Sequence, residues 1–109
     1  MILYGISTCD TSKKALKELT AAGHAVTFRD IRANPLSPAE IDRLVTEFGD
    51  RLINKTSTTW RGFSDFLKAS DPEAQIAAQP TVMKRPVIEG EGGAMTLGWD
   101  AAAQARWMP

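Results

Sequence analysis

Short apolar runs alternate with helical periodicity in the first third of the chain. The run at 2–6 is apolar apart from Gly5 and predicts a buried strand. Apolar residues then recur at helical spacing and predict a helix over about 11–22, which Gly23 ends. The apolar run at 25–28 predicts a second strand. The order strand, helix, strand favours two parallel neighbours joined by a right-handed crossover.

The clearest helix signal of the chain lies in its middle. Ser37 is placed as an N-cap, Pro38 takes the first helical position and Glu40 completes a capping box. The apolar stripe that follows stops at Gly49, where we expect the helix to end. The buried face of this helix is expected to consist of Ile41, Leu44, Val45 and Phe48.

Less regular patterns follow. Aromatic and apolar residues at 60–67 suggest a helix, and Asp71 before Pro72 looks like the capped start of another that ends before Pro80. The stretch "RPVIEGEGGAMTLG" (85–98) reads as two short strands around a glycine-rich turn. An alanine-rich segment at the C-terminal end predicts a last helix. With 109 residues, we expect one domain over 1–109 with a small mixed sheet and helices packed on it.

Composition narrows the function classes. Thirteen basic and thirteen acidic residues cancel, so no charge footprint indicates nucleic acid or an anionic membrane as a partner. No signal peptide and no membrane-spanning run of about 18 apolar residues is recognisable, so a cytoplasmic protein is expected. One cysteine excludes an internal disulfide, and one cysteine with one histidine leaves no plausible structural zinc site.

The single cysteine, Cys9, falls between the first predicted strand and the first predicted helix. A thiolate there is stabilised by helix N-terminal amides, and Lys13 adds positive charge, so a lowered pKa and a reactive thiol are expected. The alternative is an inert buried cysteine that packs as a small hydrophobe. The sequence around Cys9 is polar and favours the reactive interpretation: Ser7, Thr8, Asp10 and Thr11.

Three motifs carry a family resemblance. "GISTCDTSKKAL" (5–16), "TTWR" (58–61) and "KRPV" (84–87) occur in this order and with similar spacing in the arsenate reductase-like (ArsC/Spx/YffB) family. The chain most resembles its YffB-type branch, over essentially its whole length. The resemblance implies an α/β thioredoxin-like (glutaredoxin-like) fold, with a four-stranded mixed sheet and a helical region inserted at about 37–80.

The resemblance also implies a site. Cys9 is then the catalytic thiol, the Arg85–Pro86 bond is cis, and Arg85 faces the Cys9 loop and binds an anionic substrate group. Without the family, Arg85 reads more simply as a solvated charge at a strand end. The residues expected to bind substrate or glutathione are Thr8, Asp10, Thr11, Ser12, Lys13, Arg85 and Pro86.

The "TTWR" motif matches the family without revealing a role. Trp60 within it is either a core residue or a platform for a ligand, with core favoured. The possible family-motif site residues are Thr58, Thr59, Trp60 and Arg61.

Two departures from the family pattern bear on function. Arsenate reductases of the family hold the oxyanion with three arginines, of which only Arg85 has a counterpart here, while Asn54 and Gly98 stand at the other two places. Spx-type regulators carry Cys-x-x-Cys, whereas this chain has Ser12 at the second position, so it cannot form that disulfide.

These observations predict a monothiol, glutathione-dependent thiol–disulfide oxidoreductase with Cys9 as nucleophile. The alternatives are an arsenate reductase coupled to glutathione and glutaredoxin, and a non-enzymatic, Spx-like regulator that binds RNA polymerase. No bound cofactor or metal is expected; glutathione is the co-substrate. The expected partners are glutathione and a small-molecule or protein thiol or disulfide, not nucleic acid or membrane. The residues do not define the oligomeric state, and a monomer is the working expectation.

Overall fold

A four-stranded mixed sheet organises the computed structural model of the protein, which describes residues 1–109. The strand order is β2-β1-β3-β4. β1 pairs in parallel with β2 and antiparallel with β3, and β3 pairs antiparallel with β4. The sheet confirms the predicted parallel pair and C-terminal hairpin. Its strands are β1 (Ile2–Gly5), β2 (Thr27–Asp30), β3 (Val87–Glu89) and β4 (Met95–Leu97).

The chain comprises two compact units. The first combines residues 1–34 with 85–109 and contains the whole sheet, and the second consists of residues 35–84. The second unit covers the region where the sequence predicts an insert at about 37–80. That the chain acts as a single domain stays a prediction.

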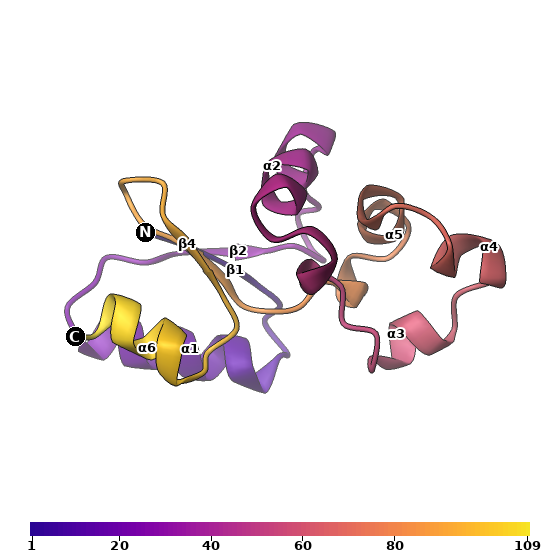
Figure 1. Cartoon of the computed structure of the whole chain (residues 1–109). Helices are drawn as coiled ribbons and strands as arrows, with labels where there is room; N and C mark the ends of the chain where they lie inside the picture. The colour runs from indigo at the N-terminus through magenta and orange to yellow at the C-terminus, as the bar shows by residue number, and fades with distance from the viewer. The chain divides into compact units, whose positions relative to one another are not determined.

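In the first unit, helices α1 (Asp10–Ala21) and α6 (Ala101–Trp107) lie on the same face of the sheet (Figure 1). Both are amphipathic, and their apolar sides meet the sheet in one buried cluster. Burying such side chains contributes about 1.5–3 kcal/mol each, which holds the helices on the sheet. The cluster consists of Leu3, Ala15, Leu19, Ile88, Trp99, Ala103 and Trp107.

Gly5, at the end of β1, lets the first turn of α1 approach the strand closely. A Cβ atom built at Gly5 would stand 2.5 Å from Ser12 Oγ and 2.8 Å from Ser12 Cβ. Real Cβ atoms are not found at such distances, so only glycine fits here. The approach buries Ser12 completely, in the helix that begins directly after Cys9.

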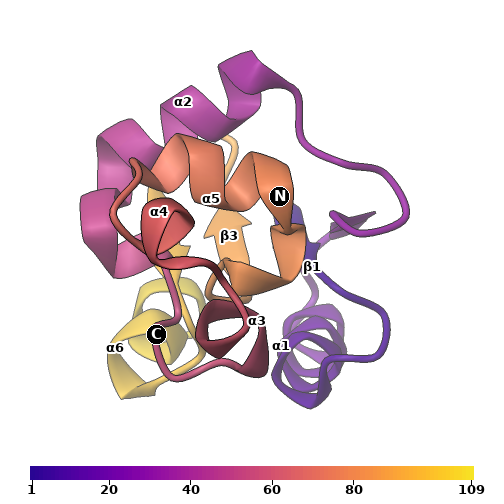
Figure 2. The same ribbon diagram turned by 90° about the vertical axis from the view of Figure 1, so that its right-hand side faces the viewer.

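The second unit is helical. α2 (Pro38–Phe48) packs against α5 (Pro72–Ala78), and two single-turn helices, α3 (Thr58–Arg61) and α4 (Asp65–Lys68), lie between them in sequence (Figure 2). Two short 3-10 helices, η1 (Gly49–Leu52) and η2 (Pro80–Val82), complete the unit, and an antiparallel bridge pairs Ile53 with Met83, the residues that follow them.

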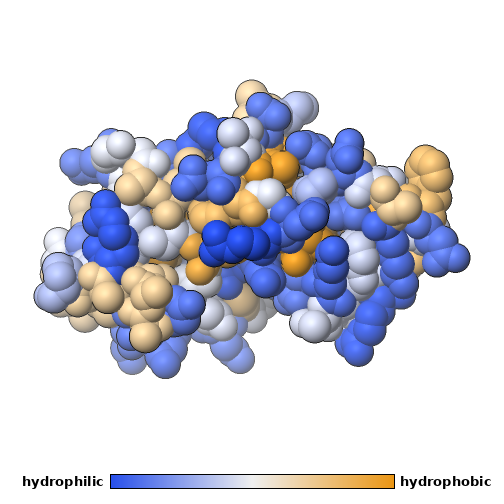
Figure 3. Space-filling model, viewed as in Figure 1, coloured by the Kyte–Doolittle hydropathy of each residue, from blue (hydrophilic) through white to orange (hydrophobic).

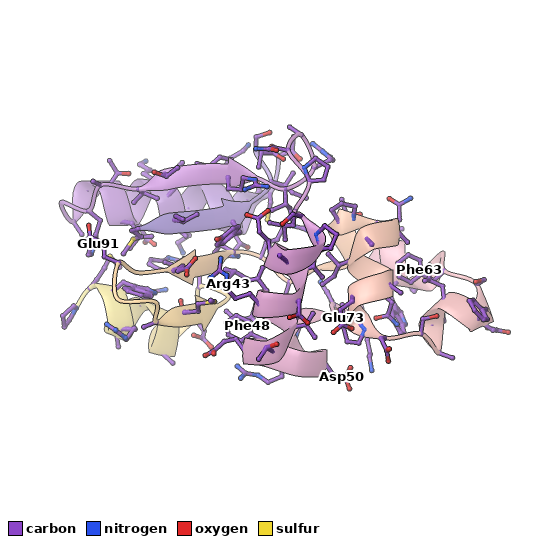
Figure 4. The ribbon with its side chains drawn as sticks, turned by 90° about the horizontal axis from the view of Figure 1, so that it is seen from above. Arg43, Phe48, Asp50, Phe63, Glu73 and Glu91 are labelled. Atoms are coloured by element: carbon purple, nitrogen blue, oxygen red, sulfur yellow. The ribbon has the colours of Figure 1, made fainter.

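Polar caps and one buried amide define the helix ends of this unit. The predicted capping box is present: Ser37 Oγ accepts from Glu40 N at 3.2 Å, and Glu40 Oε1 accepts from Ser37 N at 2.8 Å. The buried Gln75 amide donates to three carbonyl oxygens around the end of α4. Figure 4 marks Phe48, whose buried ring ends the apolar face of α2, and Glu73 in the first turn of α5.

Three predicted boundaries differ from the structure. The second strand occupies Thr27–Asp30 and not 25–28, because pairing begins where Thr27 N donates to Met1 O. The first helix starts at Asp10, with Cys9 as its N-cap. The helix predicted over 60–67 is two separate turns, because Ser64 caps a new helix where Gly62 has ended α3.

The outer surface is mostly polar. On the face drawn in Figure 3, hydrophilic residues predominate and hydrophobic residues reach the surface only in small areas. Phe66 is the one large apolar side chain that is strongly exposed. No helix has the length and apolar character needed to cross a lipid bilayer.

The contact between Gly5 and Ser12 leads to a stability prediction. Gly5→Ala is expected to lower the free energy of unfolding by about 1–3 kcal/mol, because the new methyl group overlaps the first turn of α1. Urea denaturation measures the loss. Gly92→Ala is the matched control, since a Cβ there meets nothing within 4 Å; its effect is expected within about 0.5 kcal/mol. Equal stabilities of the two variants would contradict the steric account.

Candidate functional site

Cys9 stands at the junction of β1 and α1. Its backbone is extended, its N–H donates to Ile6 O at 2.9 Å, and its carbonyl accepts the first helical hydrogen bond from Lys13 N at 3.0 Å. The side chain is half-buried, and it is the only thiol in the chain. A cysteine in the N-cap position lies next to the unsatisfied amides of the first turn, where negative charge is favoured.

The surroundings of Cys9 lower the pKa of its thiol. Burial by itself raises that pKa, but the Ser12 hydroxyl, the Ser12 backbone N–H and the Arg85 guanidinium together outweigh it. Neither Ser12 group has ordinary hydrogen-bond geometry to the sulfur, and the buried Ser12 Oγ has no hydrogen-bond partner in the structure. Both groups nevertheless lie close enough to favour the thiolate.

Arg85 approaches Cys9 from the segment that leads into the neighbouring strand, where Pro86 follows it. They directly precede β3, which pairs with β1, and the Arg85–Pro86 bond is cis, as expected. Pro86 is buried, and its carbonyl accepts from Gly98 N at 2.8 Å. The structure therefore brings Arg85 together with Cys9, as the resemblance implies; the role of Arg85 in binding stays a prediction.

The other predicted binding residues surround Cys9 in sequence, but they differ in exposure. Thr8, Asp10, Thr11 and Lys13 are all exposed at the start of α1 and accessible to a ligand. Ser12 is fully buried and faces inward, so its hydroxyl acts on the thiol rather than on solvent. The binding roles of these residues stay predictions.

The "TTWR" motif forms α3 in the second unit, and a site role for it stays a prediction. Trp60 is half-buried; its ring packs against Phe63 with centroids 6.0 Å apart, and the Lys55 ammonium lies 5.5 Å from its centroid. Thr59 shares a hydrogen bond of 2.7 Å with Thr81. These contacts fit a structural function for Trp60 and Thr59.

Sequence reasoning missed two residues at the Cys9 loop, Asp30 and Arg32. Asp30 ends β2, and its Oδ2 accepts from Ser7 N at 3.0 Å. Arg32 donates from its guanidinium to Thr8 Oγ1 at 3.2 Å. The signal that points to them is topological: the ends of parallel strands meet at one edge of a sheet, where ligands tend to bind.

Gly98, at one of the missing arginine positions, follows β4 with a φ of +83°. This conformation disfavours every residue with a Cβ, so the local backbone itself is suited to glycine. The position lies beside the cis proline through its bond to Pro86 O. No arginine therefore reaches the thiol from β4.

No group of three histidine, cysteine or acidic side chains converges to form a metal site.

The comparisons with known proteins agree with this arrangement. The model of the ArsC family matches residues 4–106, from β1 to the last turn of α6. The chain belongs to the ArsC family. The fold is accordingly the thioredoxin-like fold of ArsC proteins, and the family is one of arsenate reductase-like thiol oxidoreductases.

Three relatives show how far the similarity extends. An uncharacterized protein of Haemophilus influenzae is 39% identical over 98 residues, which cover 85% of this chain and 86% of the relative. The solved structure of a YFFB protein is 33% identical with a TM-score of 0.86 and covers 99% of this chain and 98% of its own. An arsenate reductase (ArsC) related protein of Brucella melitensis is 31% identical with a TM-score of 0.74, over 99% and 94%.

The electrostatics of Cys9 can be tested by titration. Ser12→Ala and Arg85→Gln are each expected to raise the pKa of Cys9, because each removes a group that favours the thiolate while burial of the sulfur remains. The rate of alkylation by iodoacetamide against pH measures this pKa, since the thiolate is the nucleophile. In the native protein the rate should reach its plateau at a lower pH than in either variant.

Lys17→Gln is the control for this titration. Lys17 is exposed on α1 and is not among the groups that shift the Cys9 pKa, so its removal should leave the midpoint unchanged. If the alkylation rate of the native protein has a pH midpoint at or above the free-thiol value of about 8.5, Cys9 is an inert cysteine.

Proposed function

We propose that the protein is a monothiol, glutathione-dependent thiol–disulfide oxidoreductase in which Cys9 is the nucleophile. The observation that carries the proposal is a half-buried thiol with a lowered pKa in a chain that has no second cysteine. Any disulfide at Cys9 must then include another molecule, and glutathione is an abundant small thiol of suitable charge.

The reaction consists of two exchanges. The Cys9 thiolate attacks the glutathione sulfur of a mixed disulfide between substrate and glutathione; the Cys9–glutathione bond forms, and the substrate leaves as a thiolate that takes a proton from solvent. A second glutathione thiolate then attacks the glutathione sulfur on Cys9, which releases the Cys9 thiolate and oxidised glutathione. Together the two exchanges convert the mixed disulfide and one glutathione thiol into the substrate thiol and oxidised glutathione, so that one disulfide bond is broken for each one formed.

Ser12 and Arg85 act in both exchanges. The groups that lower the pKa of Cys9 increase the thiolate fraction at neutral pH and make Cys9 a better leaving group in the second exchange. Arg85 also supplies a guanidinium that can pair with a carboxylate of glutathione. Lower pKa reduces intrinsic nucleophilicity, so a moderate shift serves the two exchanges better than an extreme one.

The arsenate alternative has less support. The relative from Brucella melitensis is described as arsenate reductase related, which brings this activity into consideration. An arsenate ion carries more than one negative charge and needs several cations around it. Here Gly98 supplies no side chain beside Pro86, and Asn54 is uncharged. The site is better matched to a carboxylate-bearing thiol.

Intact-mass spectrometry after exposure to oxidised glutathione tests the proposal. The native protein is expected to gain one glutathione on Cys9, and Cys9→Ser to gain none. Added reduced glutathione should remove the adduct, and a peptide–glutathione mixed disulfide should be turned over. Iodoacetamide alkylation provides the control for an accessible thiol: alkylation without any glutathione adduct contradicts the proposal.

Arsenate reduction is expected to be absent or very slow, because two of the three expected arginines are missing. Steady-state turnover with glutathione and glutaredoxin, measured beside an authentic arsenate reductase, gives the comparison. A similar rate in the two enzymes favours the arsenate alternative.

A pull-down of RNA polymerase tests the regulator alternative. That alternative is favoured if the native protein and Cys9→Ser both capture the polymerase and no thiol turnover is found.

A further inference from the structure

The Asp30 side chain connects the loop that carries Cys9 to the end of β2 by hydrogen bonds. Its Oδ2 accepts from Ser7 N at 3.0 Å, and its Oδ1 accepts from the backbone N–H groups of Arg32 and Ala33 at 2.9 and 3.0 Å. The N–H of Ala33 and the N–H of Ser7 are the main causes that lower the pKa of Asp30 to about 2. The ionised carboxylate therefore joins the two loops at neutral pH.

This connection places Arg32 beside the loop that carries Cys9. Its guanidinium donates to Thr8 Oγ1 at 3.2 Å, and Thr8 directly precedes Cys9. Because β1 lies between β2 and β3, Arg32 reaches the Cys9 loop from the β2 side and Arg85 from the β3 side. Two guanidinium groups thus flank the loop that presents the nucleophile.

The two arginines differ in what they do to the thiol. Arg85 is half-buried and lowers the pKa of Cys9, whereas Arg32 is exposed and is not among the groups that shift it. A guanidinium has five N–H donors in a planar fork, and the hydrogen bond to Thr8 uses one of them. An exposed cation that contacts Thr8 without shifting the pKa of Cys9 is suited to bind an anion that approaches the thiol.

We propose that Arg32 forms an anion subsite on the β2 side of Cys9, which takes a carboxylate of the thiol or disulfide substrate. The hydrogen bonds of Asp30 set the position of the Arg32 backbone, and Thr8 orients the guanidinium. The assignment of this carboxylate to glutathione rests on the proposed function; the preference of the site for anions does not.

The experiment compares two alkylating agents that differ in charge. Iodoacetamide is neutral and iodoacetate is anionic, and both attach to the Cys9 thiolate. In Arg32→Ala the iodoacetate rate is expected to fall about fivefold, the factor for losing one cation about 4 Å from the anion in water. The iodoacetamide rate and its pH midpoint should stay unchanged. Arg32→Lys should recover part of the iodoacetate rate because it retains the charge.

Arg106→Ala is the matched control. It removes the same charge, but Arg106 lines a cavity with Met1 and Glu91, at the end of the sheet opposite Cys9 (Figure 4 marks Glu91). Its ratio of iodoacetate to iodoacetamide rates should equal that of the native protein. An equal fall of both rates in Arg32→Ala leaves the ratio unchanged and would show that Arg32 only positions the loop. Two unchanged rates would show that Arg32 has no role in alkylation, and either result overturns the subsite.

The glutathione arm separates this inference from the proposed function. With a peptide–glutathione mixed disulfide, Arg32→Ala is expected to raise KM several-fold with little change in kcat or in the pH profile. If the native protein forms no glutathione adduct while the ratio of iodoacetate to iodoacetamide rates still falls in Arg32→Ala, that result contradicts the proposed function and supports the anion subsite. Arg32→Ala can instead show normal glutathione turnover, an unchanged KM and an unchanged ratio of alkylation rates. That result supports the proposed function and contradicts the anion subsite.

Discussion

The close approach of Gly5 to Ser12 is the constraint from which the site follows. Because Gly5 has no side chain, the first turn of α1 packs directly on the end of β1, and Ser12 is buried with its hydroxyl near the thiol of Cys9. Cys9 is then fixed as the N-cap, with its sulfur beside the Ser12 N–H. A larger residue at position 5 would displace the turn that stabilises the thiolate.

The pKa of Cys9 results from a balance of opposed effects. Half-burial of Cys9 disfavours its charged form, while Ser12 and Arg85 favour it more strongly. The same half-burial keeps the donors from being fully screened by water, so each donor is more effective than it would be on an open surface. Arg32 lies outside this balance: it is exposed, it contacts Thr8, and it is not among the groups that shift the pKa of Cys9.

Much of the fold was predictable from local patterns. The helix that begins at Ser37 was defined by its cap, the hairpin by its glycine-rich turn, and the sheet by the order of its apolar runs. The predicted helix over 60–67 was wrong, because its apolar spacing spans a break: Ser64 starts a new turn. The second strand was placed two residues early because its start is set by pairing with Met1 and not by its own residues.

The residues alone indicate that a single cysteine follows the first strand and opens a helix, and the motifs indicate the family. They do not reveal that Asp30 and Arg32 lie at the loop that carries Cys9. Ser7 and Asp30 are 23 positions apart, and only the parallel pairing of β1 with β2 brings them into contact. Capping and periodicity depend on residues that are close together in the sequence, so they can be recognised without the fold. The surroundings of the thiol depend on which strand ends meet, and that depends on how distant segments pair in the folded sheet.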